Sequence, residues 1–179
     1  FVANDGWADF TEQVMSEWGG WTKSDAISSD AQAIEEKKRR KAKLAGGWLT
    51  TKFAGLLTAK NLTPQTSGVN PENFAEFLHL IETGVINSAN AQKLLVLMVE
   101  TRRDPSHLLE EHHLTQMQDT KEIEGIIADL VRQNPDQVAQ IRAGKIQVMK
   151  WFMGIVMKTT EGRANPETTE AILRKELGI

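Results

Sequence analysis

The residues best suited to chemistry in this sequence are cations near its C-terminus, together with one asparagine. Lysine and arginine bind phosphate groups through charge and hydrogen bonds. Lys145 follows Gly144, so we expect it at the start of a long helix, where backbone amides and the helix dipole favour an anion. Lys158 is thirteen residues further on, about 20 Å along a helix. This spacing favours an extended polyanion over a small molecule. The candidate binding residues are Arg142, Lys145, Lys150, Lys158, Arg163 and Asn165. In the alternative interpretation Lys158 is a helix C-terminal cation and the others are solvated surface.

A second basic patch lies earlier in the chain and has the highest density of charge. It comprises Lys37, Lys38, Arg39, Arg40 and Lys41, with Lys43 close behind. At helical spacing these side chains surround the helix and form no single stripe. Two interpretations stay open: a phosphate-binding arm, or a solvated helix surface paired with Glu35 and Glu36.

No arrangement of residues predicts catalysis. Cysteine is absent, which excludes thiolate nucleophiles and thiolate metal sites. No Ser-His-Asp spacing and no phosphate-cradling glycine loop is present. His107 and Glu111 share a helix face, but two ligands are too few for a metal site. We therefore expect no catalytic residue, no metal site and no cofactor in this chain, and whether it is part of an enzyme stays open.

The tryptophans and methionines allow a similar choice between ligand contact and core packing. Five tryptophans are present, and indole rings can stack on nucleic-acid bases. Trp48 and Trp151 lie on or beside apolar helix faces, so burial is the favoured prediction for both. Met149, Met153 and Met157 recur every four residues, which is typical of a helix core.

Composition sets the frame for these candidates. The chain has 179 residues, a net charge of −3 and 40% apolar residues, enough for one domain or two small ones. Residues 35–60 carry eight lysines or arginines against two acids, and residues 141–165 carry five against one. The first residue is phenylalanine, so we expect a fragment or a processed form. No apolar run reaches membrane-spanning length.

The elements that position these residues are all predicted to be helices, which makes the fold class all-α. One apolar stripe predicts a helix over 7–18 that ends at Gly19-Gly20, and another predicts a long helix from about 28–30 to 60, interrupted at Gly46-Gly47. Capping signals predict later helix starts. These lie at Asn70-Pro71, Asn87 or Ser88, Asp104-Pro105, Asp119, Asn134-Pro135 and Asn165-Pro166. After Gly144 we expect one long helix through Met157.

The tail of the chain resembles a known family in its glycine and lysine pattern. The matching residues are Gly144-Lys145, then Gly154-Ile155-Val156-Met157-Lys158, then Gly162-Arg163-Ala164-Asn165-Pro166. They resemble the C-terminal region of the B subunit of the glutamyl/aspartyl-tRNA amidotransferases and the related YqeY-like proteins. The resemblance implies a helical domain over 1–86 and a YqeY-like tail domain over 87–179. Where the family usually has Ser-Gly-Lys at the junction, this chain has Asn87-Ser88-Ala89, without the lysine.

The resemblance also implies a function. The chain would be the tRNA-binding region of a B subunit that supports conversion of misacylated Glu-tRNA(Gln) or Asp-tRNA(Asn) to the amide form. ATP and magnesium would belong to an upstream domain. The implied partners are tRNA and the other amidotransferase subunits, with no membrane. The lengths of the basic stretch and of loop 61–70 favour the mitochondrial matrix, with the bacterial cytoplasm as the alternative. In a second hypothesis, Phe74, Phe77 and Ile81 form a face that docks another subunit without RNA contact.

Overall fold

The computed structural model describes residues 5–21, 31–117 and 119–179, and within this part of the chain every regular element is a helix. The predicted all-α class is confirmed. The chain divides into two compact units, Phe1–Leu114 and Thr115–Ile179, called unit 1 and unit 2 below. Each unit has its own cluster of buried apolar side chains. The sequence therefore builds two small cores in place of one large core.

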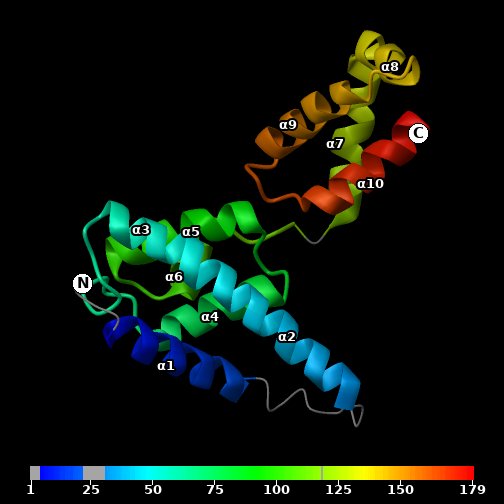
Figure 1. Ribbon diagram of the computed structural model, residues 1–179. Helices are drawn as coiled ribbons and strands as arrows, with labels where there is room; N and C mark the ends of the chain where they lie inside the picture. The colour runs from blue at the N-terminus through cyan, green and yellow to red at the C-terminus, as the bar shows by residue number, and fades with distance from the viewer. Residues whose placement is uncertain (1–4, 22–30, 118) are drawn as a thin grey trace. The chain divides into compact units, whose positions relative to one another are not determined.

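Unit 1 is built around aromatic side chains. Its elements are α1 (Asp5–Trp21), α2 (Ala31–Gly47), the π-helix η2 (Trp48–Phe53), α3 (Ala54–Ala59), α4 (Pro71–Glu82), α5 (Ser88–Thr101) and α6 (Pro105–Glu111). Helix α1 packs along α4, and α5 packs on α4 and α6 (Figure 1). At the centre, Phe53 and Phe74 are fully buried with ring centroids 4.9 Å apart. Burying each such ring contributes about 1.5–3 kcal/mol.

The first helix differs from its prediction at one end. Phe10, Val14 and Trp18 form the expected buried stripe. The helix does not end at Gly19-Gly20 but continues to Trp21. A glycine inside a helix costs about 1 kcal/mol relative to alanine. Burial of the Trp18 side chain in the preceding turn contributes more than this, so the helical conformation passes through the glycines.

The long second helix is continuous through its glycine pair but changes its hydrogen-bond pattern. Its expected start near residues 28–30 lies outside the described residues. Gly46 and Gly47 remain helical, and the π-helix η2 follows directly. The Ala54 amide donates to the carbonyl of Leu49, five residues earlier. The Thr50 hydroxyl donates to the Gly46 carbonyl at 2.6 Å, which helps to satisfy a group in the widened turn.

The division between the units lies later than the expected boundary at residues 86 and 87. Helix α5 does begin at Ser88, but it packs back into the core of unit 1 through Leu94, Leu95 and Met98, all of which are buried. The buried Asn90 amide donates to the Leu114 carbonyl at 3.2 Å. The expected boundary coincided with the predicted helix start at Asn87 or Ser88. The buried apolar contacts of α5 and α6 instead assign these helices to unit 1, with the helices that precede them.

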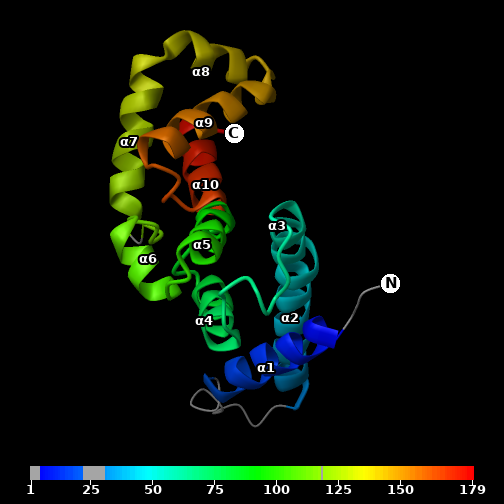
Figure 2. The same cartoon turned by 90° about the vertical axis from the view of Figure 1, so that its left-hand side faces the viewer.

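Unit 2 contains the C-terminal candidates. Its elements are α7 (Thr120–Gln133), α8 (Pro135–Arg142), the 3-10 helix η3 (Ile146–Val148), α9 (Met149–Thr159) and α10 (Pro166–Leu177). Helices α7, α9 and α10 pack on one another (Figure 2). Phe152 and Val156 of α9 are fully buried against Ile127 and Leu173. The stretch after Gly144 is therefore a 3-10 turn followed by α9, not the single long helix expected.

Most of the predicted caps are present. The side chains of Asn70, Asn87, Asp104, Asp119 and Asn165 each accept a hydrogen bond from an amide in the first turn of the helix that follows. Asn134 is different, because its side chain donates to the Leu130 carbonyl at 2.8 Å and makes no cap bond. The amide of Asn134 closes the end of α7 while Pro135 opens α8.

Candidate nucleic-acid interface

The exposed side of α9 brings together two of the predicted lysines. Met149, Phe152 and Val156 face the core of unit 2, and the opposite side of the helix is exposed. At about 100° per residue, four of the exposed positions fall within about 100° of arc. We call this surface the α9 face; its residues are Lys150, Trp151, Gly154 and Lys158.

The two lysines of the α9 face are available for binding. Within the described residues, neither the Lys150 nor the Lys158 ammonium has an ion pair or hydrogen bond. Two other exposed cations of unit 2 do have partners: Arg132 pairs with Asp129, and Arg174 pairs with Glu170 at 2.9 Å. Helix α9 itself contains no acidic residue. Its exposed side is therefore a locally positive surface.

Arg142 and Lys145 lie at the other end of the same segment. Lys145 precedes η3, and its amide already donates to the Gln140 carbonyl at 3.0 Å. The predicted phosphate site, with free backbone amides at the start of a long helix, is therefore not present at Lys145. The Lys145 side chain is exposed. The Arg142 side chain is also exposed, and its Nε donates to the Leu177 carbonyl at 3.4 Å.

Arg163 and Asn165 support the fold. Arg163 is half-buried, its Nε donates to the Thr160 carbonyl at 3.3 Å, and its own carbonyl accepts from the Met117 amide at 2.9 Å. The Asn165 side chain accepts from the Thr168 amide at 3.0 Å and so caps α10. Of the six predicted residues, the structure brings Lys150 and Lys158 onto one face and uses Asn165 as a cap.

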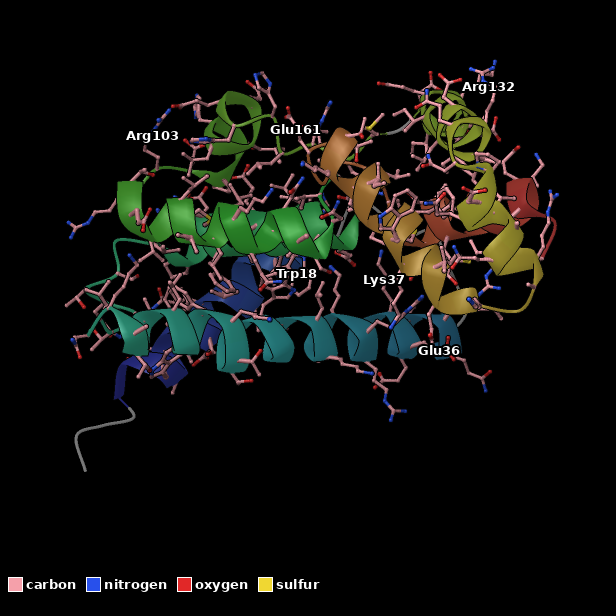
Figure 3. All side chains as sticks on the ribbon, turned by 90° about the horizontal axis from the view of Figure 1, so that it is seen from above. Trp18, Glu36, Lys37, Arg103, Arg132 and Glu161 are labelled. Carbon is pink, nitrogen blue, oxygen red and sulfur yellow. The ribbon has the colours of Figure 1, made fainter. Side chains whose placement is uncertain are left out.

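The basic run on α2 is divided between surface and structure. Lys38, Arg39 and Arg40 are exposed and, as expected, point in different directions around the helix. Lys41 instead packs inside unit 1: its Nζ lies 3.3 Å from Glu82 Oε2 and 4.6 Å from the centre of the Trp18 ring. Figure 3 shows Trp18 within this unit and Lys37 near the beginning of α2. Lys41 is thus a structural cation, which the sequence pattern alone did not reveal.

A groove on unit 1 gathers further cations that the sequence did not single out as a set. It has a volume of about 570 Å³, and Arg40, Lys43 and Lys52 line it. The Lys52 ammonium donates to the Gln92 side-chain oxygen at 3.3 Å, so one of the three cations is already engaged. The three cations come from the continuous α2–η2 segment, and Ser88 and Gln92 at the start of α5 also line the groove.

Burial was the favoured prediction for Trp48 and Trp151, and the structure separates them. Trp48 is buried, with 7% of its surface exposed, and packs edge-to-face on Phe77. Trp151 is 42% exposed on the α9 face. The prediction for Trp151 was wrong because the apolar stripe of α9 is centred on Phe152 and Val156. Trp151 directly precedes Phe152, so its side chain points about 100° away from that of Phe152 around the helix axis.

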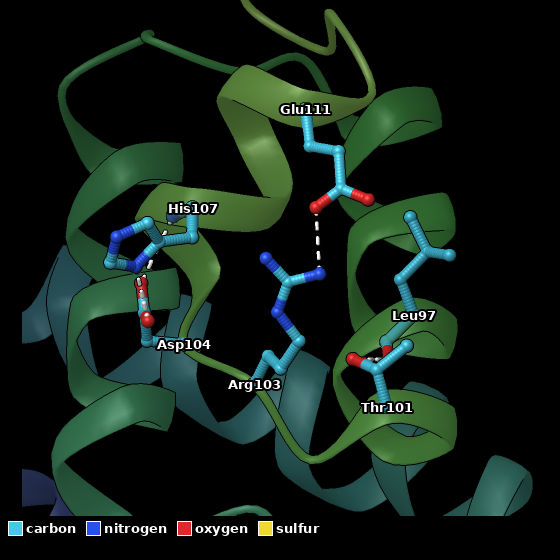
Figure 4. Close-up of polar contacts among 6 residues, drawn as sticks. All are labelled: Leu97, Thr101, Arg103, Asp104, His107 and Glu111. Atoms are coloured by element: carbon cyan, nitrogen blue, oxygen red, sulfur yellow. Dashed lines mark hydrogen bonds and ion pairs between the residues drawn. The ribbon is translucent and has the colours of Figure 1, made fainter.

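The histidine and carboxylate residues near α6 have separate local partners (Figure 4). His107 Nδ1 lies 2.5 Å from Asp104 Oδ2, and Glu111 accepts from the Arg103 guanidinium at 2.7 Å. The hydrogen bond and charge of Asp104 raise the pKa of His107. The hydrogen bond from the His107 amide is the main cause that lowers the pKa of Asp104. In the described part of the chain, no group of three or more metal-ligating side chains is brought together.

The face proposed for docking another subunit is not a surface. Phe74 and Phe77 are fully buried in the core of unit 1, and Ile81 is half-buried beside them. Their periodicity reports core packing, so this form of the protein-docking hypothesis is wrong. None of the described helices has the length and apolar character needed to cross a membrane.

Comparisons with known proteins place these observations in a family. The B subunit of the aspartyl/glutamyl-tRNA(Asn/Gln) amidotransferase of Rhodospirillum rubrum is 35% identical over 179 residues, which is 99% of this chain and 35% of that protein. The protein of the same name from Paramagnetospirillum magneticum is 36% identical over 140 residues, covering 78% of this chain and 29% of the relative. A Coxiella burnetii protein of that name is 34% identical over 135 residues, covering 75% and 28%.

The chain spans about a third of the length of the curated relatives it matches. These relatives are bacterial proteins, so the expected mitochondrial matrix location has no support from them. The family pattern described as "GatB domain" matches residues 31–177, which includes most of unit 1 and nearly all of unit 2. Because this match covers most of its length, the chain belongs to the GatB domain family.

Proposed function

We propose that this chain is the tRNA-binding C-terminal region of an amidotransferase B subunit. The relatives are named for an enzyme that acts on aspartyl- and glutamyl-tRNA. The observation that carries the proposal for this chain is the α9 face, where Lys150 and Lys158 lie unpaired on a helix without acids, in a chain whose net charge is −3. Local clusters, not net charge, determine where a polyanion binds.

The proposed role is to hold the RNA while the chemistry takes place elsewhere. Flexible lysine side chains contact phosphates and carry little base information, so recognition would depend on backbone and shape. We propose that ATP, magnesium and the reacting aminoacyl group bind to a part of the B subunit outside these 179 residues, and that the other amidotransferase subunits complete the enzyme.

Salt-dependent binding of the full chain to tRNA tests this function. We expect the affinity, measured by fluorescence anisotropy, to fall steeply as salt increases, because bound lysines release counterions from the RNA. The double variant Lys150→Gln/Lys158→Gln removes two such contacts. Its affinity should fall by about tenfold or more, and its salt slope should decrease by about 1–2.

The matched control is Arg132→Gln/Arg174→Gln. It changes the net charge by the same amount within the same unit, but it removes cations that already have partners, Asp129 and Glu170. We expect this control to bind tRNA within about twofold of the wild-type affinity. Failure of the wild-type chain to bind tRNA, or equal losses in the two double variants, would overturn the proposed site.

A second candidate function rests on a different surface. An apolar groove of about 810 Å³ runs between α1 and the α2–η2 segment, lined by residues that include Trp7, Met15, Ala45 and Leu49. Such a groove suits another subunit of the enzyme, with binding insensitive to salt. A Met15→Glu variant that loses subunit assembly but retains tRNA affinity would support this function beside the first.

A further inference from the structure

The exposed indole of Trp151 is an apolar feature of unit 2 that core packing does not explain. Most large apolar side chains of this unit lie in its core, whereas Trp151 is 42% exposed in the first turn of α9. Single exposed apolar residues are common. What distinguishes Trp151 is its setting, because Lys150 precedes it and Lys158 lies two turns further along the same side of α9.

The surface beside the indole has no side chain at Gly154. Gly154 lies between the two lysines on the stripe formed by every fourth residue. A Cβ atom added to Gly154 would have no neighbour within 4 Å, so this position faces open space. The α9 face therefore presents an indole next to bare backbone, with one ammonium on each side. The two lysines are eight residues apart, about 12 Å along the axis.

The indole is also held in place from below. Its ring contacts the ring of Phe152 edge-to-face, with centroids 5.0 Å apart and an interplanar angle of 83°. Phe152 is fully buried in the core of unit 2. This support limits the rotamers of Trp151, so less conformational entropy is lost when a ligand covers it.

We propose that Trp151 stacks on an unpaired base of the bound RNA, with Lys150 and Lys158 contacting phosphates on either side of that base. This inference rests on the proposed function and assigns a stacking residue within it. Every base has a π-face, so such a contact is tolerant of sequence. Unpaired bases in RNA loops are available for stacking, whereas paired bases are not. The positive ends of the α9 face favour RNA over an apolar protein segment as the occupant.

The stacking contact is tested with Trp151→Ala and Trp151→Phe, compared with Ile146→Ala. Ile146 is a matched control because it is an exposed apolar residue of the same unit, 55% exposed, that lies before α9. We expect Trp151→Ala to weaken tRNA binding by about tenfold with an unchanged salt slope, because no charge is removed. Trp151→Phe keeps a stacking ring and should bind within about threefold. Ile146→Ala should match the wild type.

Two further measurements separate stacking from loss of structure. Circular dichroism checks that each variant is folded. A short single-stranded RNA and a blunt RNA duplex of the same length then serve as probes. Trp151→Ala should weaken binding to the single strand and leave binding to the duplex unchanged, which a folding defect would not do.

Each outcome distinguishes the inference from the function on which it rests. If Trp151→Ala binds tRNA like the wild type while Lys150→Gln/Lys158→Gln loses affinity, the stacking contact is wrong and the proposed function stands. If the wild-type chain binds neither tRNA nor single-stranded RNA, both are overturned. If Trp151→Ala impairs assembly with the other subunits but leaves RNA binding unchanged, the α9 face is a protein interface and the inference is again overturned.

Discussion

The two basic segments of this chain place their cations differently. On α2, Lys38, Arg39 and Arg40 point around the helix, and Lys41 is drawn into the fold by Glu82 and Trp18. On α9, Lys150 and Lys158 share one exposed stripe without a partner in the described residues. The segment with the higher density of charge therefore does not form a single positive face. Alignment on one face and freedom from an ion pair make a cation available to a polyanion, and charge density alone does not.

The largest expected effect sharpens the contrast between the core and the exposed side of α9. Phe152→Ala removes a fully buried ring from unit 2 and should lower its free energy of unfolding by about 3–5 kcal/mol. That is a large fraction of the stability of a small unit. Substitution of the neighbouring residue, Trp151→Ala, should lower the free energy of unfolding by less than about 1 kcal/mol. Amide hydrogen exchange in α9 measures both, and equal losses would show that Trp151 belongs to the core.

The next effect tests whether Lys41 is structural. Lys41→Met keeps the length of the side chain but removes the ammonium that lies 3.3 Å from Glu82, and the Lys41 side chain is only 12% exposed. We expect unit 1 to lose about 1–3 kcal/mol of unfolding free energy, less than for a fully buried pair. Lys150→Met, on the exposed face, should change stability by less than about 0.5 kcal/mol.

Urea unfolding can report on unit 1 alone. Trp151 is the only tryptophan between residues 115 and 179, so in a Trp151→Phe background the tryptophan fluorescence comes from unit 1. A Lys41→Met variant that unfolds at the same urea concentration as its parent would place Lys41 among the surface cations and return it to the candidate RNA-binding residues.

The sequence predicted the helices better than it predicted the surfaces. Periodicity identified the buried stripes of α1 and α4, and Asn70, Asn87, Asp104 and Asn165 were correctly predicted as caps. These signals are local, since a cap and its amide are three residues apart. The pairing of Lys41 with Glu82, the placement of α5 in unit 1 and the exposure of Trp151 depend on packing between distant segments. Local patterns do not contain that information.

A smaller effect separates a capping residue from a binding residue. Asn165 was predicted to contact tRNA, but its side chain accepts the Thr168 amide at 3.0 Å. Asn165→Ala should therefore lower the stability of unit 2 by about 1 kcal/mol and leave tRNA affinity unchanged at temperatures where the unit is folded. Asn165→Ser, which restores an N-cap, should recover the stability. A loss of affinity in both variants without loss of stability would restore Asn165 to the binding surface.

The smallest expected effect concerns His107, a cation of unit 1 that already has its partner. Asp104 raises the pKa of His107 above its usual 6.5 and has its own pKa lowered from 3.8. The charged pair therefore stabilises the start of α6 at pH values between the lowered pKa of Asp104 and the raised pKa of His107. The Asp104 contribution disappears as the pH falls through its lowered pKa, and the His107 contribution disappears as the pH rises through its raised pKa.

Asp104→Asn keeps an N-cap for α6 but removes the carboxylate charge. The His107 ring protons, followed by NMR, should then titrate at lower pH than in the wild type. Because His107 is held by Asp104 and lies outside the α9 face, tRNA affinity measured between pH 6 and 8 should respond equally in the wild type and in His107→Gln. A pH response that vanishes in His107→Gln would show that unit 1 also supplies a titrating cation to the RNA, and the contrast between the two basic segments would then be incomplete.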